Sequence, residues 1–147
     1  MNERVIEQPR NIEAALSGYG TPIEAVVDEA YRNSKAKGFH DQGDDATFGD
    51  RIALMHSELS EALEEYRNGI PVGRVYFEGG PGGSPLDWEY GITPTSEKPK
   101  GIPIELADVV IRIADFCGKH GIDLARAVKI KMAFNTTRPT RHGGKRL

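Results

Sequence analysis

The sequence has little of what secreted, disulfide-stabilised or membrane proteins require. It contains one cysteine, Cys117, so an internal disulfide and a cysteine-rich metal site are excluded. The N-terminal stretch MNERVIEQPR carries charges where a signal peptide needs an apolar segment, and no apolar run elsewhere is long enough to span a membrane. We therefore expect a cytoplasmic protein without a membrane partner, in which Cys117 is a small buried residue.

An excess of charge of one sign is also missing. Lys and Arg total 19 and Asp and Glu total 22, for a net charge of -3. Such a chain has no overall attraction to nucleic acid, so we expect no nucleic-acid partner. Its 147 residues are enough for one domain and too few for two independent cores.

Helical spacing of apolar residues dominates the chain after residue 20. Capping residues and glycines at the ends of these segments define four predicted helices: Thr21 to about Lys37, Thr47 to Asn68, near Pro103 to between Gly118 and Gly121, and Asp123 to about Thr137. Four helices of this kind favour an all-α fold, a four-helix bundle. We assign the bundle to residues 21–147 and interpret residues 1–20 as an N-terminal extension.

The segment from 70 to 101 interrupts the helical pattern. Its 32 residues include seven glycines and five prolines, which cannot continue a helix. We interpret it as a long Gly/Pro-rich loop insertion between the second and third core helices, with a short hairpin that pairs Val75–Phe77 with Trp88–Tyr90. A loop of this length is either a surface excursion or a functional lid, and the sequence leaves both open.

Acidic residues fall on single strips of two predicted helices. At about 100° per residue, Glu58, Glu61 and Glu65 lie on one strip of the second helix, bordering its apolar stripe. The third helix carries a comparable strip, and apolar residues occupy nearly every other direction around it. The members of that second strip are Glu105, Asp108, Arg112 and Asp115. A solvated acidic face remains the alternative for the second helix, but it fits Glu105 and Asp108 poorly.

Carboxylates in apolar surroundings need a nearby cation, because burial and mutual repulsion both disfavour their charged form. Two acid pairs at i, i+3, Glu58 with Glu61 and Glu105 with Asp108, could converge from antiparallel helices on a hard cation. An all-oxygen set favours Mg²⁺ or Mn²⁺, because zinc and redox-iron sites normally include histidine or thiolate. The structural alternative is that Arg112, one turn beyond Asp108, neutralises the acids.

The fourth predicted helix mixes cations with apolar residues. Lys131, Asn135 and Arg138 share a face with residues that we expect to point inward: Leu124, Ala127, Val128 and Phe134. Long basic side chains covering an apolar surface would look the same, so this alternative stays open. The tail after Pro139 adds further cations, Arg141, His142, Lys145 and Arg146. Acids beside cations are typical of phosphate chemistry, in which metals align oxygens and basic residues hold the rest.

Two quoted segments resemble a known family. HSELSEALEEYRNG, followed by PIELADVVIRIADFCGKHGIDLARAVKIKMAFNTTRPTRHGGKR, is similar to the MazG-like, all-α nucleotide pyrophosphohydrolases. The signature of that family is an E-x-x-E pair followed on the next helix by E-x-x-D, here Glu58 with Glu61 and Glu105 with Asp108. The resemblance runs from about Thr21 to the C-terminus and omits the glycine-rich loop.

The resemblance implies hydrolysis of a nucleoside triphosphate between the α and β phosphates, giving a nucleoside monophosphate and pyrophosphate. It implies that the four signature acids bind Mg²⁺, with Mn²⁺ as a substitute, and that Glu58 or Glu61 accepts the proton of the attacking water. Lys131, Asn135 and Arg138, with Lys145 from the tail, would contact phosphate or sugar, and Lys131 would support catalysis. Family members assemble as homodimers or homotetramers, so we expect a homo-oligomer.

The insertion departs from the family pattern. It leaves open which nucleotides the site accepts, because the insertion could cover the base of a bound nucleotide or block nucleotides that other family members accept. Two other readings remain. A di-iron or di-manganese carboxylate bundle would need an E-x-x-H that these helices lack. A non-catalytic regulatory bundle that binds a nucleotide or a partner would keep the same surface without turnover.

Overall fold

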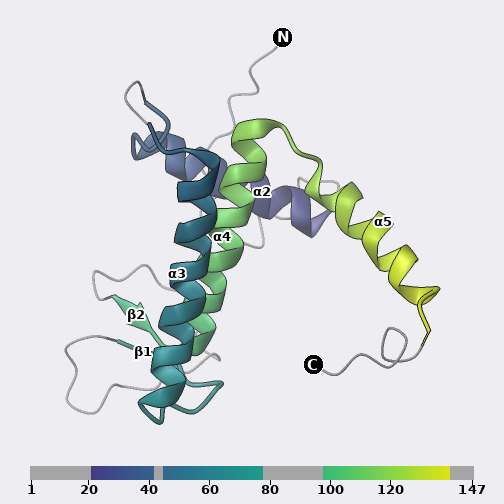
Figure 1. Ribbon diagram of the computed structural model, residues 1–147. Coiled ribbons are helices and arrows are strands. Elements are labelled where there is room, and N and C mark those ends of the chain that lie inside the picture. The colour runs from purple at the N-terminus through teal and green to yellow at the C-terminus, as the bar shows by residue number, and fades with distance from the viewer. Residues whose placement is uncertain (1–20, 42–44, 78–97, 140–147) are drawn as a thin grey trace. The chain divides into compact units, whose positions relative to one another are not determined.

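The protein is described by a computed structural model covering residues 21–41, 45–77 and 98–139. Within these ranges the chain is mostly helical, as predicted: α2 (Pro22–Ala36), α3 (Phe48–Arg67), α4 (Ile102–His120) and α5 (Leu124–Thr136), with two short strands, β1 (Tyr76–Phe77) and β2 (Pro99–Lys100) (Figure 1). The chain divides into two compact units, residues 40–113 and residues 1–39 with 114–147. No helix in the described ranges combines the length and apolar character needed to cross a membrane.

Local sequence explains where the helices begin and end. The side chains of Thr21 and Asp123 each accept a hydrogen bond from the backbone amide three residues later. Thr47 forms a complete capping box, because its hydroxyl accepts from the Asp50 amide while its own amide donates to the Asp50 carboxylate. These bonds satisfy amides that the first turn of a helix leaves without a partner. The predicted helix boundaries are therefore confirmed closely.

Small side chains are the buried ones among the described residues of the unit made by residues 1–39 and 114–147. In this part α2 packs against α5, and the buried residues are Ala25, Ala114, Cys117 and Ala125. The prediction that Cys117 is buried is confirmed, and burial raises the pKa of its thiol. A Cβ atom added to Gly118 would lie 2.5 Å from the Cβ of Tyr31. The end of α4 thus approaches α2 at a distance that only glycine allows.

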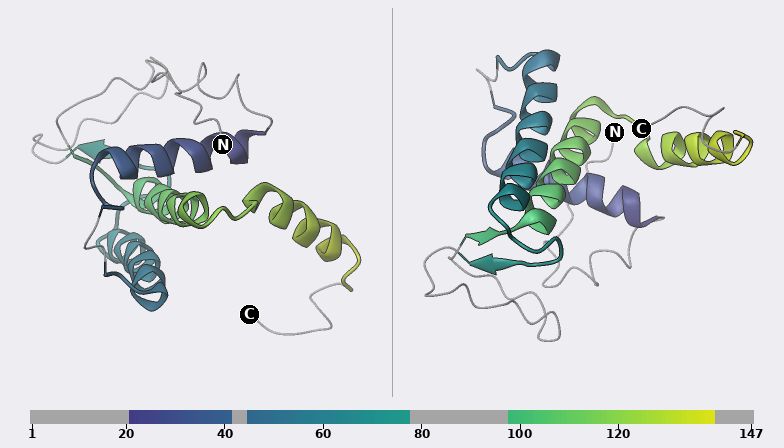
Figure 2. Two further views of the ribbon diagram at one scale, coloured as in Figure 1. Left: turned by 90° about the horizontal axis from the view of Figure 1, so that it is seen from above. Right: turned by 60° about the horizontal axis from the view of Figure 1, so that its bottom comes forward.

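In the unit of residues 40–113, α3 and the first part of α4 lie beside a two-stranded ribbon (Figure 2). Strands β1 and β2 are antiparallel, and Tyr76 pairs with Lys100 and Phe77 with Pro99. A strand at Val75–Phe77 was predicted, but its observed partner is Pro99–Lys100. The predicted partner, Trp88–Tyr90, lies outside the described residues, as do most of the 70–101 insertion and the 1–20 extension.

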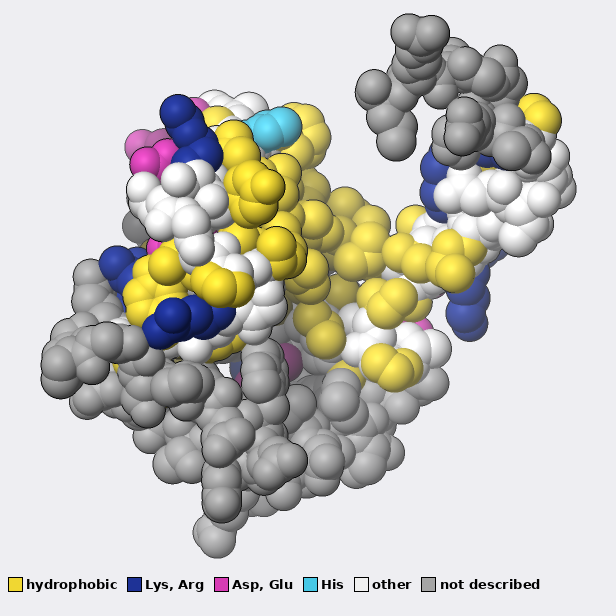
Figure 3. Space-filling view, turned by 90° about the horizontal axis from the view of Figure 1, so that it is seen from below, with side chains coloured by type: hydrophobic (Ala, Val, Ile, Leu, Met, Phe, Trp, Pro, Cys, Tyr) yellow, Lys and Arg dark blue, Asp and Glu magenta, His cyan; other side chains and the backbone are white. Residues whose placement is uncertain are grey.

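Several apolar residues of the predicted helices lie at the surface, where Figure 3 shows apolar side chains in the open. The exposed members include Phe48, Leu59, Leu63, Tyr66, Leu106, Val110 and Ile111. The expectation that α4 has almost no solvent face is wrong for the single chain. On α5 the predicted inward set is wrong in part, because Ala127 and Phe134 are exposed, whereas Leu124 and Val128 are half-buried and Ala125 is buried. Helical periodicity identifies residues that share a face, but it does not establish that anything covers that face.

The close approach at Gly118 predicts a stability effect. Within a helix Ala normally stabilises relative to Gly by about 0.5–1 kcal/mol, but here the new methyl group would collide with Tyr31. We expect Gly118→Ala to lower the free energy of unfolding by about 1–3 kcal/mol, as overpacking does. Urea denaturation would measure it, with Gly73→Ala as the control because nothing lies within 4 Å of a Cβ at Gly73. A Gly118→Ala protein more stable than wild type would contradict the packing.

Candidate metal centre

Three carboxylates from two helices come together in the unit of residues 40–113. Glu58 of α3 and Glu105 and Asp108 of α4 each offer one oxygen, and these oxygens all lie within 4.8 Å of one another. Glu58 and Glu105 are each only 6% exposed, and Asp108 is partly buried. The structure therefore brings together three of the four acids that the sequence singled out, and it removes two of them almost completely from water.

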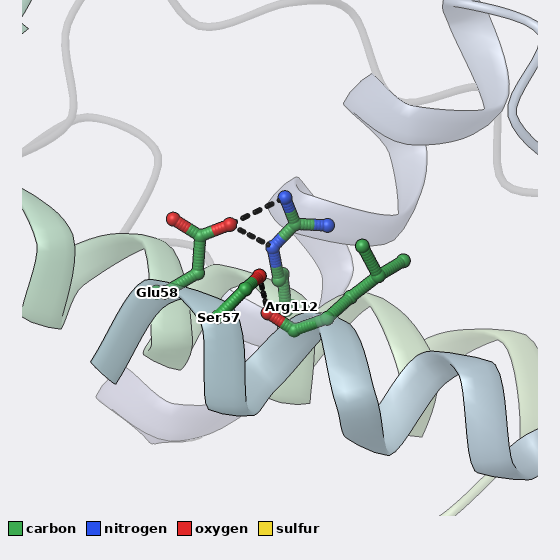
Figure 4. A network of polar contacts seen from close by, with 4 residues as sticks. Ser57, Glu58 and Arg112 are labelled. Atoms are coloured by element: carbon green, nitrogen blue, oxygen red, sulfur yellow. Dashed lines mark hydrogen bonds and ion pairs between the residues drawn. The ribbon is translucent and has the colours of Figure 1, made fainter. Parts of the chain in front are cut away.

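The helical repeat explains the part that α4 plays in this group. Residues three apart face the same way, so Glu105 and Asp108 project from one side of the first turns of α4. On α3, the small residue Ala62 lies one turn after Glu58, and both residues are buried. The side chain of Ser57 does not join the acids, because its hydroxyl donates to the carbonyl of Leu54 on the same helix at 2.8 Å (Figure 4).

An arginine already binds one of the three acids. Nε and Nη2 of Arg112 lie 2.8 and 2.6 Å from the same oxygen of Glu58, Oε1 (Figure 4). The other oxygen of Glu58 points away from the guanidinium group. The alternative that Arg112 neutralises the acids thus holds for Glu58. It does not extend to Glu105 and Asp108, because among the described residues no hydrogen bond to their carboxylates is formed.

The electrostatics of the two α4 acids follow from their surroundings. Burial raises the pKa of Glu105 above its usual range, and the negative charges of Glu61, Asp108 and Glu58 raise it further. Burial also raises the pKa of Asp108, with Glu58 adding to the effect, while Arg112 and Lys98 oppose it. Both carboxyl groups are thus harder to ionise than free acids, which is the condition of a group that lacks sufficient positive charge nearby.

Glu61 and Glu65 hold different positions around this group. Glu61 is exposed and is not among the three converging acids, yet its charge reaches Glu105. Glu65 accepts hydrogen bonds from the hydroxyl of Tyr76, with its two oxygens 3.0 and 2.9 Å away. The sequence did not identify Tyr76, and the only signal for it was an aromatic residue within the insertion. This bond attaches β1 to α3.

The other predicted site residues lie outside the acidic group. The ammonium of Lys131, on α5, and the guanidinium of Arg138, beyond the end of α5 at Thr136, lie 5.1 and 5.9 Å from the centre of the Phe134 ring. Asn135, on the last turn of α5, is exposed. Lys145 lies outside the described residues.

The donor set suits a hard divalent cation. Mg²⁺ binds oxygen ligands at about 2.1 Å, so two oxygens on opposite sides of the ion lie about 4.2 Å apart. Oxygens within 4.8 Å of one another reach such an arrangement by small side-chain adjustments. The three carboxylates also supply no histidine or thiolate, as expected for Mg²⁺ or Mn²⁺ rather than zinc. The residues present therefore fit the ion that the sequence led us to expect.

Comparison of the chain with models of known protein families, with curated proteins and with solved structures gave no match. The chemistry of this group therefore has to be argued from the residues themselves.

The acidic group predicts opposite effects for two substitutions in the metal-free protein. Asp108→Asn removes repulsion and is expected to leave the fold intact or to raise its melting temperature. Arg112→Met leaves Glu58 buried without its cation. We expect this substitution to lower the free energy of unfolding by about 1–2 kcal/mol. This is less than for a fully buried pair, because the Arg112 side chain is 40% exposed.

Thermal and urea unfolding in EDTA would measure both changes. Arg67→Met is a matched control, since Arg67 pairs with Glu64 at 3.8 Å on an exposed surface, where such pairs contribute less than about 1 kcal/mol. A marked loss of stability in Asp108→Asn would contradict this view and would assign the acids a structural role with Arg112.

Proposed function

We propose that the protein is a nucleoside triphosphate pyrophosphohydrolase that requires Mg²⁺ and cleaves between the α and β phosphates. The observation that supports it is the convergence of Glu58, Glu105 and Asp108 from two helices. These acids belong to the E-x-x-E and E-x-x-D pairs through which the chain resembles the MazG-like family, and the mostly helical structure is compatible with an all-α fold.

In this proposal Glu58, Glu105 and Asp108 hold the ion, and Glu61 completes the ligand set. Mg²⁺ supplies positive charge to the phosphate oxygens and lowers the pKa of a water molecule. The burial of Glu58 and Glu105 excludes bulk water from one side of the site, which strengthens each electrostatic interaction there. Glu61 is exposed and close enough to influence Glu105, so it is the acid best placed to accept a proton from the attacking water.

The cations of α5 take the remaining negative charge in this proposal. Lys131, Asn135 and Arg138 are assigned to phosphate or sugar because they match the family resemblance in position. Lys131 and Arg138 extend over the exposed ring of Phe134. A cation over an aromatic face keeps its charge available while its stem covers apolar surface.

Arg112 restricts how a metal ion could bind Glu58 in this proposal. It occupies one oxygen of Glu58 in the described structure, and an ion that binds the same carboxylate has to use the other oxygen or displace the guanidinium. The first route needs no rearrangement of Arg112, because the second oxygen of Glu58 points away from it (Figure 4). The ion pair and the metal site are therefore compatible.

The direct test is pyrophosphate release from a panel of ribonucleoside and deoxynucleoside triphosphates, with Mg²⁺ and with EDTA. We expect release that needs Mg²⁺ and that falls at least 100-fold in Glu61→Gln, the order of magnitude of a lost general base. Glu64→Gln is the matched control, because Glu64 is exposed on the same helix and pairs with Arg67 at its surface. In the same assay Lys131→Met should raise KM.

Two outcomes would overturn the hydrolase. Release that persists in EDTA would exclude a metal-dependent reaction. Saturable binding of nucleotide by folded, metal-loaded protein without release would favour the alternative function, a non-catalytic nucleotide- or partner-binding regulatory bundle. A di-iron centre would instead be recognised by redox-active iron in the purified protein.

We also propose that the chain assembles as a homodimer or homotetramer. The exposed apolar residues of α3 and α4 include Leu59, Leu63 and Val110, which in a single chain leave a large apolar surface in water. Sedimentation should give a mass that is a multiple of the single chain. Leu63→Glu should shift it toward the monomer, whereas Ser60→Glu, with the same charge on an exposed polar position, should not. A monomer at micromolar concentration would contradict the assembly.

A further inference from the structure

The two ends of the insertion are joined to each other immediately before α4. Strand β1 pairs with β2 in antiparallel register, with Tyr76 opposite Lys100. Only Gly101 separates the end of β2 from Ile102, the first residue of α4. All of these residues belong to the unit of residues 40–113. The β1–β2 ribbon therefore holds the end of the insertion from which α4 begins.

The junction between the ribbon and α4 requires glycine. Gly101 has φ of 115°, a conformation that other residues rarely adopt, and a Cβ there would overlap the carbonyl oxygen of Arg74. The carbonyl of Gly101 accepts hydrogen bonds from the amides of Ile104 and Glu105, at 2.9 and 3.2 Å. The same residue thus lets the chain pass close to Arg74 and begins the hydrogen bonds of α4.

The side of α4 that is buried at this junction is the side that carries Glu105. Ile102 is buried, and so is Val75, which lies at the other end of the insertion just before β1. Glu105 follows Ile102 by three residues, so the two side chains project from the same side of the helix. One oxygen of Glu105 lies within 4.8 Å of oxygens of Glu58 and Asp108. A shift or rotation of the first turn would therefore move Glu105 away from the other two acids.

A second attachment joins the ribbon to the helix that carries Glu58. The hydroxyl of Tyr76, on β1, donates to the carboxylate of Glu65 on α3, with the two oxygens 3.0 and 2.9 Å away. Glu65 lies about two turns after Glu58, so it projects from the same side of α3. The ribbon is thus bonded to the helix that supplies Glu58 and continues directly into the helix that supplies Glu105.

We propose that the β1–β2 ribbon positions Glu105 for the metal ion, with Gly101 as its attachment to α4 and Tyr76 as its attachment to α3. This inference rests on the metal centre of the proposed function. Gly101 and Tyr76 are positioning residues, since they act through the place where the first turn of α4 starts. Support of this kind matters because a ligand that is already oriented loses less conformational freedom when it binds an ion. The described ends of the insertion then belong to the metal centre.

Mn²⁺ affinity, measured by calorimetry on the full chain without nucleotide, tests this inference. We expect Gly101→Ala to weaken Mn²⁺ binding about tenfold or more, as loss of support for a metal ligand does. Gly69→Ala is the matched control, because Gly69 also has a positive φ, 80°, but nothing lies within 4 Å of a Cβ there. Both variants strain the backbone, and only Gly101→Ala displaces the start of α4. Equal Mn²⁺ affinity in the two variants would overturn the inference.

Tyr76→Phe takes the place of Gly101→Ala if thermal unfolding shows that Gly101→Ala does not fold. It removes the hydroxyl that binds Glu65. A released Glu65 adds negative charge that favours a cation, whereas a displaced Glu105 weakens its binding, so the two effects have opposite signs. We expect Mn²⁺ binding to weaken about tenfold, but not in Tyr66→Phe, which changes an exposed tyrosine on α3. Unchanged or tighter binding in Tyr76→Phe would then overturn the inference.

A metal-free measurement separates this inference from the proposed function. Mn²⁺ binding needs no turnover, so a failure of hydrolysis leaves the first test intact. If wild type binds no Mn²⁺, the metal role fails, and a double-mutant cycle of Gly101→Ala and Glu105→Gln in EDTA tests the placement of Glu105 by itself. Glu105→Gln should raise the melting temperature of wild type, because it removes repulsion from Glu58 and Asp108. The rise should be smaller in Gly101→Ala, or in Tyr76→Phe if that variant is used. Equal rises in both backgrounds, or none in wild type, would overturn the placement.

Discussion

The repulsion among Glu58, Glu105 and Asp108 is the constraint to which the rest of this region responds. Oxygens of three acids lie within 4.8 Å of one another, and two of those side chains are almost removed from water. Carboxylates in such a place are stable only when protonated or when positive charge is near. Burial, with the charges of neighbouring acids, raises the pKa of both Glu105 and Asp108, and Lys98, joined at Asp108 by Arg112, only opposes this rise.

The neighbouring elements can be understood as responses to that constraint. Arg112 takes one oxygen of Glu58, and it reaches across from α4 to α3, so the same bond also joins the two helices. On the other side, the Tyr76–Glu65 bond holds the base of the insertion near α3 and α4. The first contact neutralises one oxygen of Glu58, whereas the second involves Glu65, which is not one of the three converging acids. What is left is a set of acidic oxygens that is only partly neutralised, so mutual repulsion among them persists.

Sequence reasoning succeeded where structure is decided locally and failed where it depends on distant parts of the chain. Helix ends were predictable because Thr47 and Asp123 cap them through bonds to residues three positions away. The i, i+3 relation of Glu105 and Asp108 was predictable for the same reason. The strand partner of Tyr76 and the exposure of Leu63 and Phe134 were not, since each depends on what lies opposite, and helical spacing carries no information about that.

The ion pair of Arg112 also bears on how the site works. A buried pair contributes little net stability, because desolvation of both charges offsets their attraction, so the Arg112–Glu58 bond is not needed to hold α3 and α4 together. Its value lies in orientation: it fixes one oxygen of Glu58 and leaves the other turned away from the guanidinium. A carboxylate held in one direction loses less conformational freedom when it binds a ligand. Arg112 therefore holds Glu58 in one direction through one oxygen and leaves the other oxygen outside the ion pair.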